Sequence, residues 1–167
     1  MGKKYELTEE TKEFYGRTLY RIKALKDFGD VEVGDLGGYI ESESNLIQEG
    51  CAWVYGNAMV CSDAMVCSDA MVCSDAKVYG DAKVFDNANV CGDAEIKGKT
   101  DYIVFKNWWS SRRYFTWTRS NNMWKVGCFY GTGKELVEKA NKDSELSGRE
   151  YERVVKYVKS ILADEKK

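Results

Sequence analysis

The sequence predicts a mainly β protein in which a β-solenoid is flanked by a β-hairpin and by a small cap of strands and helices. Two observations carry this prediction. Eight six-residue units follow one another without a break over residues 54–101, and the segments on either side show the periods of strands and helices instead. The chain has 167 residues, of which 44% are hydrophobic and 13% aromatic, so it can fill a core of about one domain.

Residues 1–37 predict a β-hairpin that leads into the solenoid and caps it. The expected strands cover residues 5–11 and 17–25, and apolar and charged side chains alternate over residues 20–24. The glycine-rich stretch 34–38 predicts turns before the first solenoid strand.

The repeat occupies most of residues 38–101 and reads VYGNAM, VCSDAM, VCSDAM, VCSDAK, VYGDAK, VFDNAN, VCGDAE, IKGKTD from Val54 onward. Each unit starts with an aliphatic residue and has a small residue at its fifth place. A period of six fits neither the seven of a coiled coil nor the 3.6 of a single helix. Asp or Asn beside Gly or Ser is turn chemistry, so short strands and tight corners are expected. Leu46 continues the spacing, with two extra residues before Val54.

This pattern resembles the hexapeptide-repeat family, and the leader resembles a set of phage and prophage proteins described as hexapeptide-transferase-like or polymer-forming. The resemblance implies a left-handed parallel β-helix with three hexads per coil and a homotrimer. Residues 18 apart would stack at about 4.8 Å. Cys61, Cys67 and Cys73 would then lie on different faces and bind no common metal. Cys73 and Cys91 would stack, but the spacing between stacked strands is expected to be too wide for a relaxed disulfide. We therefore expect free thiols at the cysteines.

Residues 102–167 predict a cap of three strands followed by two helices (βββαα) that covers the open end of the solenoid. The expected strands are residues 102–105, 112–118 and 123–130, and the expected helices are residues 134–141 and 147–164. Thr132 is expected near the N-cap of the first helix.

Composition excludes several classes of enzyme. The chain contains no histidine, so it builds no Ser-His-Asp triad, no Cys-His dyad and no His-ligated zinc site by itself. Acyltransferases of the hexapeptide-repeat family commonly use a histidine base, and we therefore expect a protein that is not an enzyme and has no cofactor or metal. No signal peptide or long apolar run is evident, which predicts a cytoplasmic protein without membrane contact, in a bacterial host cell if it is phage-encoded.

The charge is uneven although the net charge is only −2. Residues 40–100 contain ten acidic residues against four lysines, whereas residues 101–125 contain five basic residues against Asp101 alone. The basic segment also holds four of the five tryptophans. Aromatic and guanidinium groups suit stacking on bases and pairing with phosphates, and the alternative is the core of a small sheet. The predicted ligand-binding residues are Trp108, Trp109, Arg112, Arg113, Tyr114, Trp117, Arg119 and Trp124.

Three functional hypotheses follow. The first is a non-catalytic phage-type protein that sequesters a small anionic ligand, such as a nucleotide signal of host defence, on this aromatic and arginine-rich segment. The second is a scaffold or inhibitor whose acidic β-helix binds a host protein. The third is a divergent acyltransferase.

Overall fold

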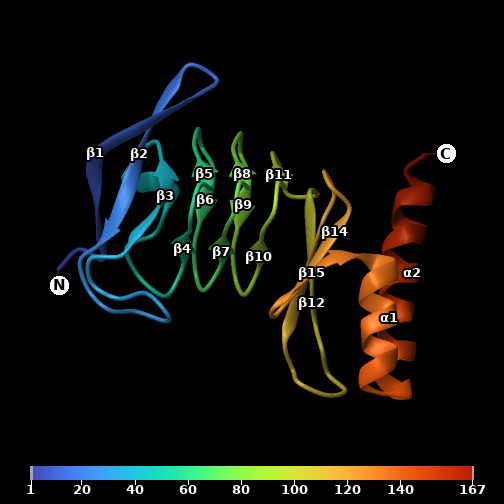
Figure 1. Cartoon of the computed structure of the whole chain (residues 1–167). Helices are drawn as coiled ribbons and strands as arrows, with labels where there is room; N and C mark the ends of the chain where they lie inside the picture. The colour runs from blue at the N-terminus through green and yellow to red at the C-terminus, as the bar shows by residue number, and fades with distance from the viewer. Residues whose placement is uncertain (1, 167) are drawn as a thin grey trace.

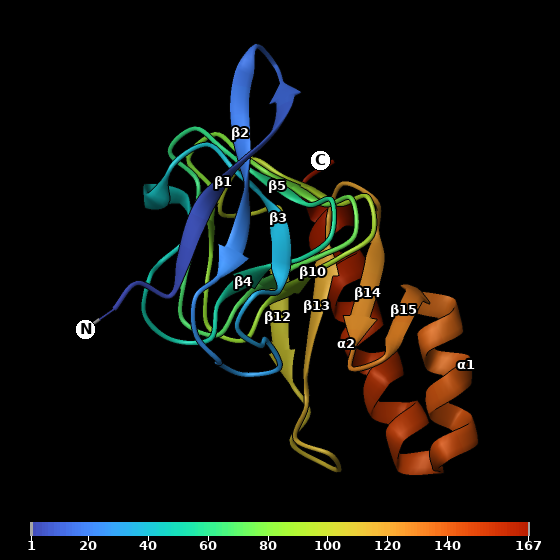
Figure 2. The same cartoon turned by 60° about the vertical axis from the view of Figure 1, so that its left-hand side comes forward.

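The computed structural model describes residues 2–166 and shows three parts arranged in a row (Figure 1). The hairpin lies at one end, the stacked coils of a parallel β-helix lie in the middle, and a sheet covered by two helices lies at the other end. Figure 2, turned by 60°, shows the coils enclosing a common interior. The predicted fold class, a mainly β protein with a parallel β-helix and a C-terminal helical cap, is confirmed.

The N-terminal hairpin extends one sheet of the β-helix. β1 (Tyr5–Phe14) pairs antiparallel with β2 (Arg17–Ala24), and the turn between them places Tyr15 and Gly16 at φ of 48° and 73°. β2 pairs with β3 (Leu36–Ile40), which in turn pairs in parallel with a strand of the next coil. The hairpin thus joins the first coil through a continuous sheet.

The glycines at 37 and 38 form part of β3, and the prediction that they make a turn was wrong. Both are buried. A Cβ at Gly37 would lie 2.5 Å from Ile22 Cγ1, and one at Gly38 would lie 2.5 Å from the Ala58 carbonyl oxygen. Glycine is required here by the close approach of neighbouring chain segments.

Three sheets form the faces of the β-helix. The first face contains β3, β5 (Met59–Val60), β8 (Lys77–Val78) and β11 (Glu95–Ile96). The second contains β4 (Trp53–Val54), β7 (Met71–Val72) and β10 (Asn89–Val90), and the third contains β6 (Met65–Val66) and β9 (Lys83–Val84). A short 3-10 helix, η1 (Glu43–Asn45), lies in the first coil.

The strand register confirms the 18-residue coil. Met59 pairs with Lys77, and Met71 pairs with Asn89. In the first coil the offset between paired residues is 20, since Leu46 bridges to Val66. The two extra residues before Val54 predict this longer offset.

The aliphatic and small positions of the hexads fill the interior. The aliphatic residues that recur every six positions from Val54 to Ile96 are at most 1% exposed. The same holds for the alanines that recur every six positions from Ala58 to Ala94. The third position of each of the first seven hexads has a positive φ, which explains the Gly, Ser and Asp found there. The eighth hexad departs from the pattern, because Thr100 is exposed where the chain leaves the β-helix.

The cysteine prediction was wrong for one pair. Cys73 and Cys91 form a disulfide, and their Cα atoms are 4.7 Å apart, a separation that disulfides tolerate. Cys51, Cys61, Cys67 and Cys128 are free. Cys61 and Cys67 follow strands of different faces.

Within residues 2–166 no three His, Cys, Asp or Glu side chains gather in a way that would hold a metal ion.

Two residues at the start of the chain cover the first coil. The Lys4 side chain is fully buried, and its Nζ donates to the carbonyl oxygens of Ala52 at 2.8 Å and Glu49 at 3.4 Å. The Tyr5 hydroxyl donates to the Leu46 carbonyl oxygen at 2.7 Å. Burial lowers the pKa of Lys4 to about 8, because removal from water disfavours the ammonium form.

This burial predicts a pH dependence of stability. Lysine in the unfolded chain has a pKa near 10.5, so between pH 8 and 10.5 the unfolded state binds more protons than the folded state. The unfolding free energy of the wild type, measured relative to a Lys4→Met variant, should therefore rise by about 1–2 kcal/mol over this range. Urea unfolding at pH 7.5, 8.5 and 9.5 measures the difference, with Lys3→Met as the exposed control. If the difference in unfolding free energy between wild type and Lys4→Met falls or stays constant as the pH rises, the pKa of Lys4 is not lowered by burial.

The C-terminal sheet has four antiparallel strands rather than the three predicted. They are β12 (Tyr102–Lys106), β13 (Tyr114–Thr118), β14 (Met123–Val126) and β15 (Phe129–Thr132). The expected third strand is divided at Gly127, whose φ of 53° turns the chain back, so the cap is ββββαα. The sheet covers the last coil directly, since Asn89 N donates to Thr116 Oγ1 at 2.9 Å and Glu95 N donates to Ser120 Oγ at 2.7 Å.

Helices α1 (Gly133–Asp143) and α2 (Glu145–Asp164) lie against the outer face of this sheet (Figure 1). The N-cap prediction is confirmed: Thr132 Oγ1 accepts from Glu135 N at 3.3 Å, and Glu135 Oε2 accepts from Thr132 N at 2.8 Å. Neither helix has an apolar stretch long enough to cross a membrane among the described residues.

Candidate functional site

The predicted ligand-binding residues do not form one exposed surface. Trp117 and Trp124 are only 1% and 2% exposed and lie with Phe115 in the core between the sheet and the helices. Side chains alternate along β13 and β14, and α1 and α2 cover the face on which these rings lie. The core alternative therefore applies to these two tryptophans.

The other aromatic and basic residues lie in separate places. Trp109 is half-buried, with its ring centroid 5.2 Å from that of Tyr151. Arg119 lies over the Trp117 ring and pairs with Glu165, with Nη2 3.1 Å from Oε1. Trp108 and Arg112 lie in the loop 107–113, and Tyr114 is the first residue of β13. All three are exposed.

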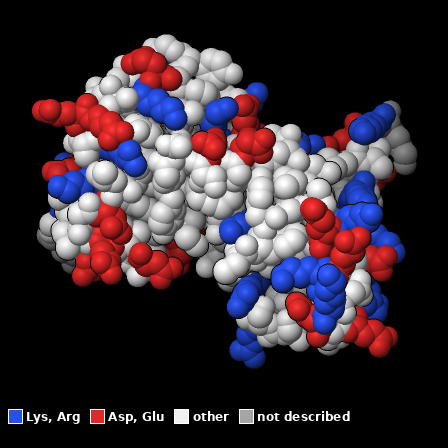
Figure 3. Space-filling model, viewed as in Figure 1, with Lys and Arg blue, Asp and Glu red and all other residues white. Residues whose placement is uncertain are grey.

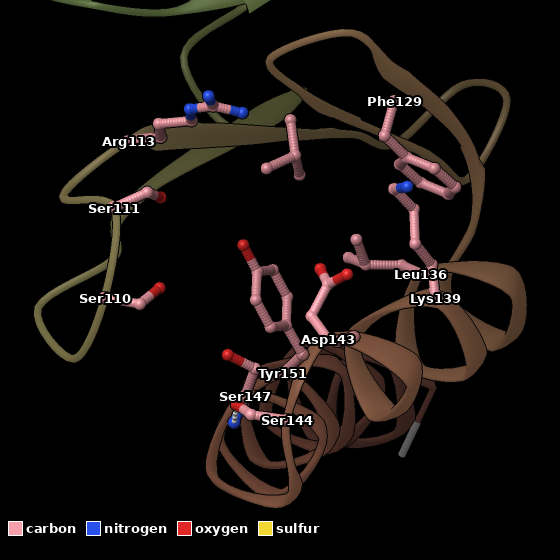
Figure 4. Close-up of a pocket in the computed structure, with 12 residues that line it drawn as sticks. Ser110, Ser111, Arg113, Phe129, Leu136, Lys139, Asp143, Ser144, Ser147 and Tyr151 are labelled. Carbon is pink, nitrogen blue, oxygen red and sulfur yellow. Dashed lines mark hydrogen bonds between the residues drawn. The ribbon is translucent and has the colours of Figure 1, made fainter.

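Arg113 lines a cavity of about 360 Å³ between the loop 107–113, the sheet and the two helices (Figure 4). We call this cavity the cap pocket. Its lining residues are Ser110, Ser111, Arg113, Val126, Phe129, Leu136, Lys139, Ala140, Asp143, Ser144, Ser147 and Tyr151.

Polar groups from three elements face this pocket. In Figure 4 the Tyr151 hydroxyl points into the space between the loop and the helices, with Arg113 and Ser111 on one side and Lys139 on the other. Ser144 and Ser147 lie at its base. Ser144 is the N-cap of α2, and its Oγ accepts from Ser147 N at 3.1 Å. Ser144 is also the C-cap of α1, so the positive end of the α2 dipole and the negative end of the α1 dipole meet at the pocket.

Asn107 holds the loop in place. Its side chain is 1% exposed, and its Nδ2 donates to Ser110 Oγ at 2.9 Å and to the Tyr151 hydroxyl at 3.4 Å. Its Oδ1 accepts from Ser110 N at 2.9 Å, and its backbone N donates to the Arg113 carbonyl at 2.8 Å. The loop and α2 are thus connected through one buried amide, which preorganises the pocket.

The pocket has more cationic than anionic side chains. It contains Arg113 and Lys139 against the single carboxylate of Asp143. Within residues 2–166 none of these three side chains makes an ion pair. Basic side chains also gather on the surface of this part of the molecule, interspersed with acidic ones (Figure 3).

The Tyr151 hydroxyl is kept as a hydrogen-bond donor. Burial raises the pKa of Tyr151, and the charge of Asp143 raises it further, whereas the Asn107 amide and Arg113 act in the opposite direction. The net shift is upward, so the phenol stays protonated at neutral pH. The arrangement of two cations and several hydroxyls is suited to binding an anion.

Most of these pocket residues were not predicted as functional. Ser110 and Ser111 are small polar residues typical of a turn, and Tyr151 lies in the predicted helix 147–164 at the spacing of its apolar residues. Neither pattern indicates a binding site. The convergence of these residues with Arg113 depends on how the helix pair packs on the sheet.

Comparison with known proteins gives a partial match. No protein-family model matches the chain. The chain is similar to the "Uncharacterized acetyltransferase YdcK" of Escherichia coli (strain K12), with 39% identity over 61 residues that cover 32% of this chain and 19% of the relative. The matched part thus spans about a fifth of that protein's length. Together with the stacked 18-residue coils, this similarity fits a hexapeptide-repeat protein.

Proposed function

We propose that this chain of hexapeptide-repeat type is a non-catalytic protein that binds a small anionic ligand in the cap pocket. The observation that carries the proposal is that Arg113 and Lys139 line one cavity, against the single carboxylate of Asp143. Neither cation has an ion-pair partner among the described residues, so both are available to a ligand.

The size and lining of the pocket favour a phosphorylated ligand of nucleotide class. Small-molecule sites usually start at about 300 Å³, and the cap pocket holds about 360 Å³. Arg113 and Lys139 supply the charge for a phosphate, and the rings of Phe129 and Tyr151 supply aromatic wall for a base. A nucleotide signal of host defence, sequestered by a phage-type homotrimer in the host cytoplasm, is the specific form of this proposal.

The absence of histidine supports a binding role rather than catalysis. A second candidate, an acyltransferase, is favoured by the printed name of the similar Escherichia coli protein. Turnover of acyl-coenzyme A donors distinguishes the two. The scaffold hypothesis, in which the acidic β-helix binds a host protein, would instead give a complex that survives loss of the cap-pocket cations.

Arg113→Gln is expected to weaken nucleotide binding by at least about tenfold, since one charge-assisted contact to phosphate is lost. Isothermal titration calorimetry against a panel of linear and cyclic nucleotides measures the effect, with adenosine monophosphate as the simplest probe. Arg112→Gln is the matched control, because Arg112 is adjacent and exposed but does not line the pocket.

Equal binding by the two variants would contradict the assignment of the pocket. Absence of binding by every nucleotide at millimolar concentration would contradict the nucleotide class, and inorganic phosphate and pyrophosphate would then test the anion site alone.

A further inference from the structure

A second hollow lies beside the end of the β-helix, outside the cap pocket. It is a groove of about 710 Å³ between a corner of the last coils and the first strand of the C-terminal sheet. We call it the edge groove. Its lining residues are Lys83, Phe85, Asp86, Lys99, Tyr102, Ile103, Val104, Phe105, Lys106 and Tyr114.

Two sheet edges border the edge groove. β12 is the edge strand of the four-stranded sheet, and β9 is the outer strand of the two-stranded face of the β-helix. All five residues of β12 line the groove. The groove thus follows the whole length of the strand, and the side chains of residues 102–105 are half-buried beside it.

β12 pairs with β13 on one side only, so the backbone N–H and C=O groups of every second residue have no partner strand in the described part of the chain. Arg119 N donates to the Asp101 carbonyl, and Asn107 N donates to the Arg113 carbonyl. In an antiparallel ladder these two contacts place the odd-numbered residues in hydrogen-bonded pairs with β13. The N–H and C=O groups of Tyr102, Val104 and Lys106 consequently point outward, toward the position of an additional strand.

The side chains around the groove are apolar and basic. Phe85 is 46% exposed and Tyr114 is 37% exposed, which is high for large rings. Lys83, Lys99 and Lys106 surround them, with Asp86 as the one acidic lining residue. Within the part of the chain that the structure describes, none of these three lysines makes an ion pair.

We propose that the edge groove binds an extended acidic segment of a partner protein, which pairs with β12 as an additional strand. The free backbone groups of β12 supply the main-chain hydrogen bonds of strand addition. Phe85 and Tyr114 contact apolar side chains of the segment, and the three lysines pair with its carboxylates. Charge complementarity thus selects an acidic partner, and this site is independent of the anion proposed for the cap pocket.

Three synthetic peptides test the proposal by fluorescence polarisation. The first alternates glutamate with apolar residues (Glu-Val-Glu-Phe-Glu-Val-Glu), the second replaces every glutamate with lysine, and the third is the acidic peptide with alternate backbone nitrogens methylated. We expect binding of the acidic peptide only, since the lysine peptide is repelled and methylation removes the donors needed for strand pairing.

Variants of the protein locate the site. The triple change Lys83→Glu, Lys99→Glu and Lys106→Glu should weaken binding of the acidic peptide by at least about tenfold. Phe85→Ser tests the apolar contact with no charge change. Lys139→Glu is the matched control, because it reverses a lysine of the cap pocket and leaves the edge groove intact.

Absence of acidic-peptide binding at millimolar concentration, or equal binding of the methylated or lysine peptide, would overturn the proposal. So would self-association of the wild type that Phe85→Ser abolishes in analytical ultracentrifugation, since the occupant would then be a second copy of this chain.

Discussion

Replacing Trp124 with alanine is expected to lower the free energy of unfolding by about 3–5 kcal/mol, because a fully buried aromatic side chain is lost and a cavity remains. Trp124 is 2% exposed, and its ring centroid lies 6.0 Å from that of Phe115 and 6.1 Å from that of Phe105. These rings form the layer on which both helices pack. Urea unfolding followed by circular dichroism measures the change.

Trp108→Ala is the matched control, because Trp108 belongs to the same tryptophan-rich segment but is 72% exposed. Its stability should stay within about 0.5 kcal/mol of the wild type. If Trp124→Ala were as stable as Trp108→Ala, the assignment of Trp124 to the core would be wrong, and the predicted aromatic binding surface would regain support.

Replacing Gly38 with alanine should cost about 3 kcal/mol of stability. The added Cβ would lie 2.5 Å from the Ala58 carbonyl oxygen and 2.7 Å from Val54 Cγ1. The Ala58 oxygen accepts a 2.9 Å hydrogen bond from Tyr39 N, so it cannot move away without breaking the ladder between β3 and the next coil. Thermal and urea unfolding both report the loss.

Gly98→Ala provides the comparison for this change. A Cβ at Gly98 meets only Asp81 Oδ1, at 3.9 Å, and its backbone is not in the left-handed region. We expect a stability within about 0.5 kcal/mol of the wild type. Equal stability of the two alanine variants would show that β3 does not approach the second coil as closely as described.

The β-helix was predictable from the sequence because its period and its packing are the same property. An aliphatic residue every six positions specifies which side chains point inward, and the two extra residues before Val54 specify the 20-residue offset of the first coil. Gly37 and Gly38 were misjudged because glycine indicates a turn locally, whereas here the reason is the approach of Ile22 and Ala58 from elsewhere in the chain.

The structural role of the basic segment 101–125 was less predictable. Alternation along β13 correctly groups Phe115 with Trp117 on one face, yet only the packing of α1 and α2 decides that this face is the core. The division of the last strand at Gly127 was missed because the residues on both sides favour strands. Lys139, Ser147 and Tyr151 belong to helices whose placement no local pattern gives, so their convergence with Arg113 needed the structure.

Binding of a phosphorylated small molecule in the cap pocket can be observed in a crystal structure grown with millimolar 8-bromoadenosine monophosphate. The anomalous signal of bromine locates the base independently of the protein. We predict a phosphate within hydrogen-bond distance of Arg113 or Lys139, with the base against Tyr151 or Phe129. Bromine density at another site, or a cap pocket without nucleotide in crystals that hold it elsewhere, would contradict the proposed function.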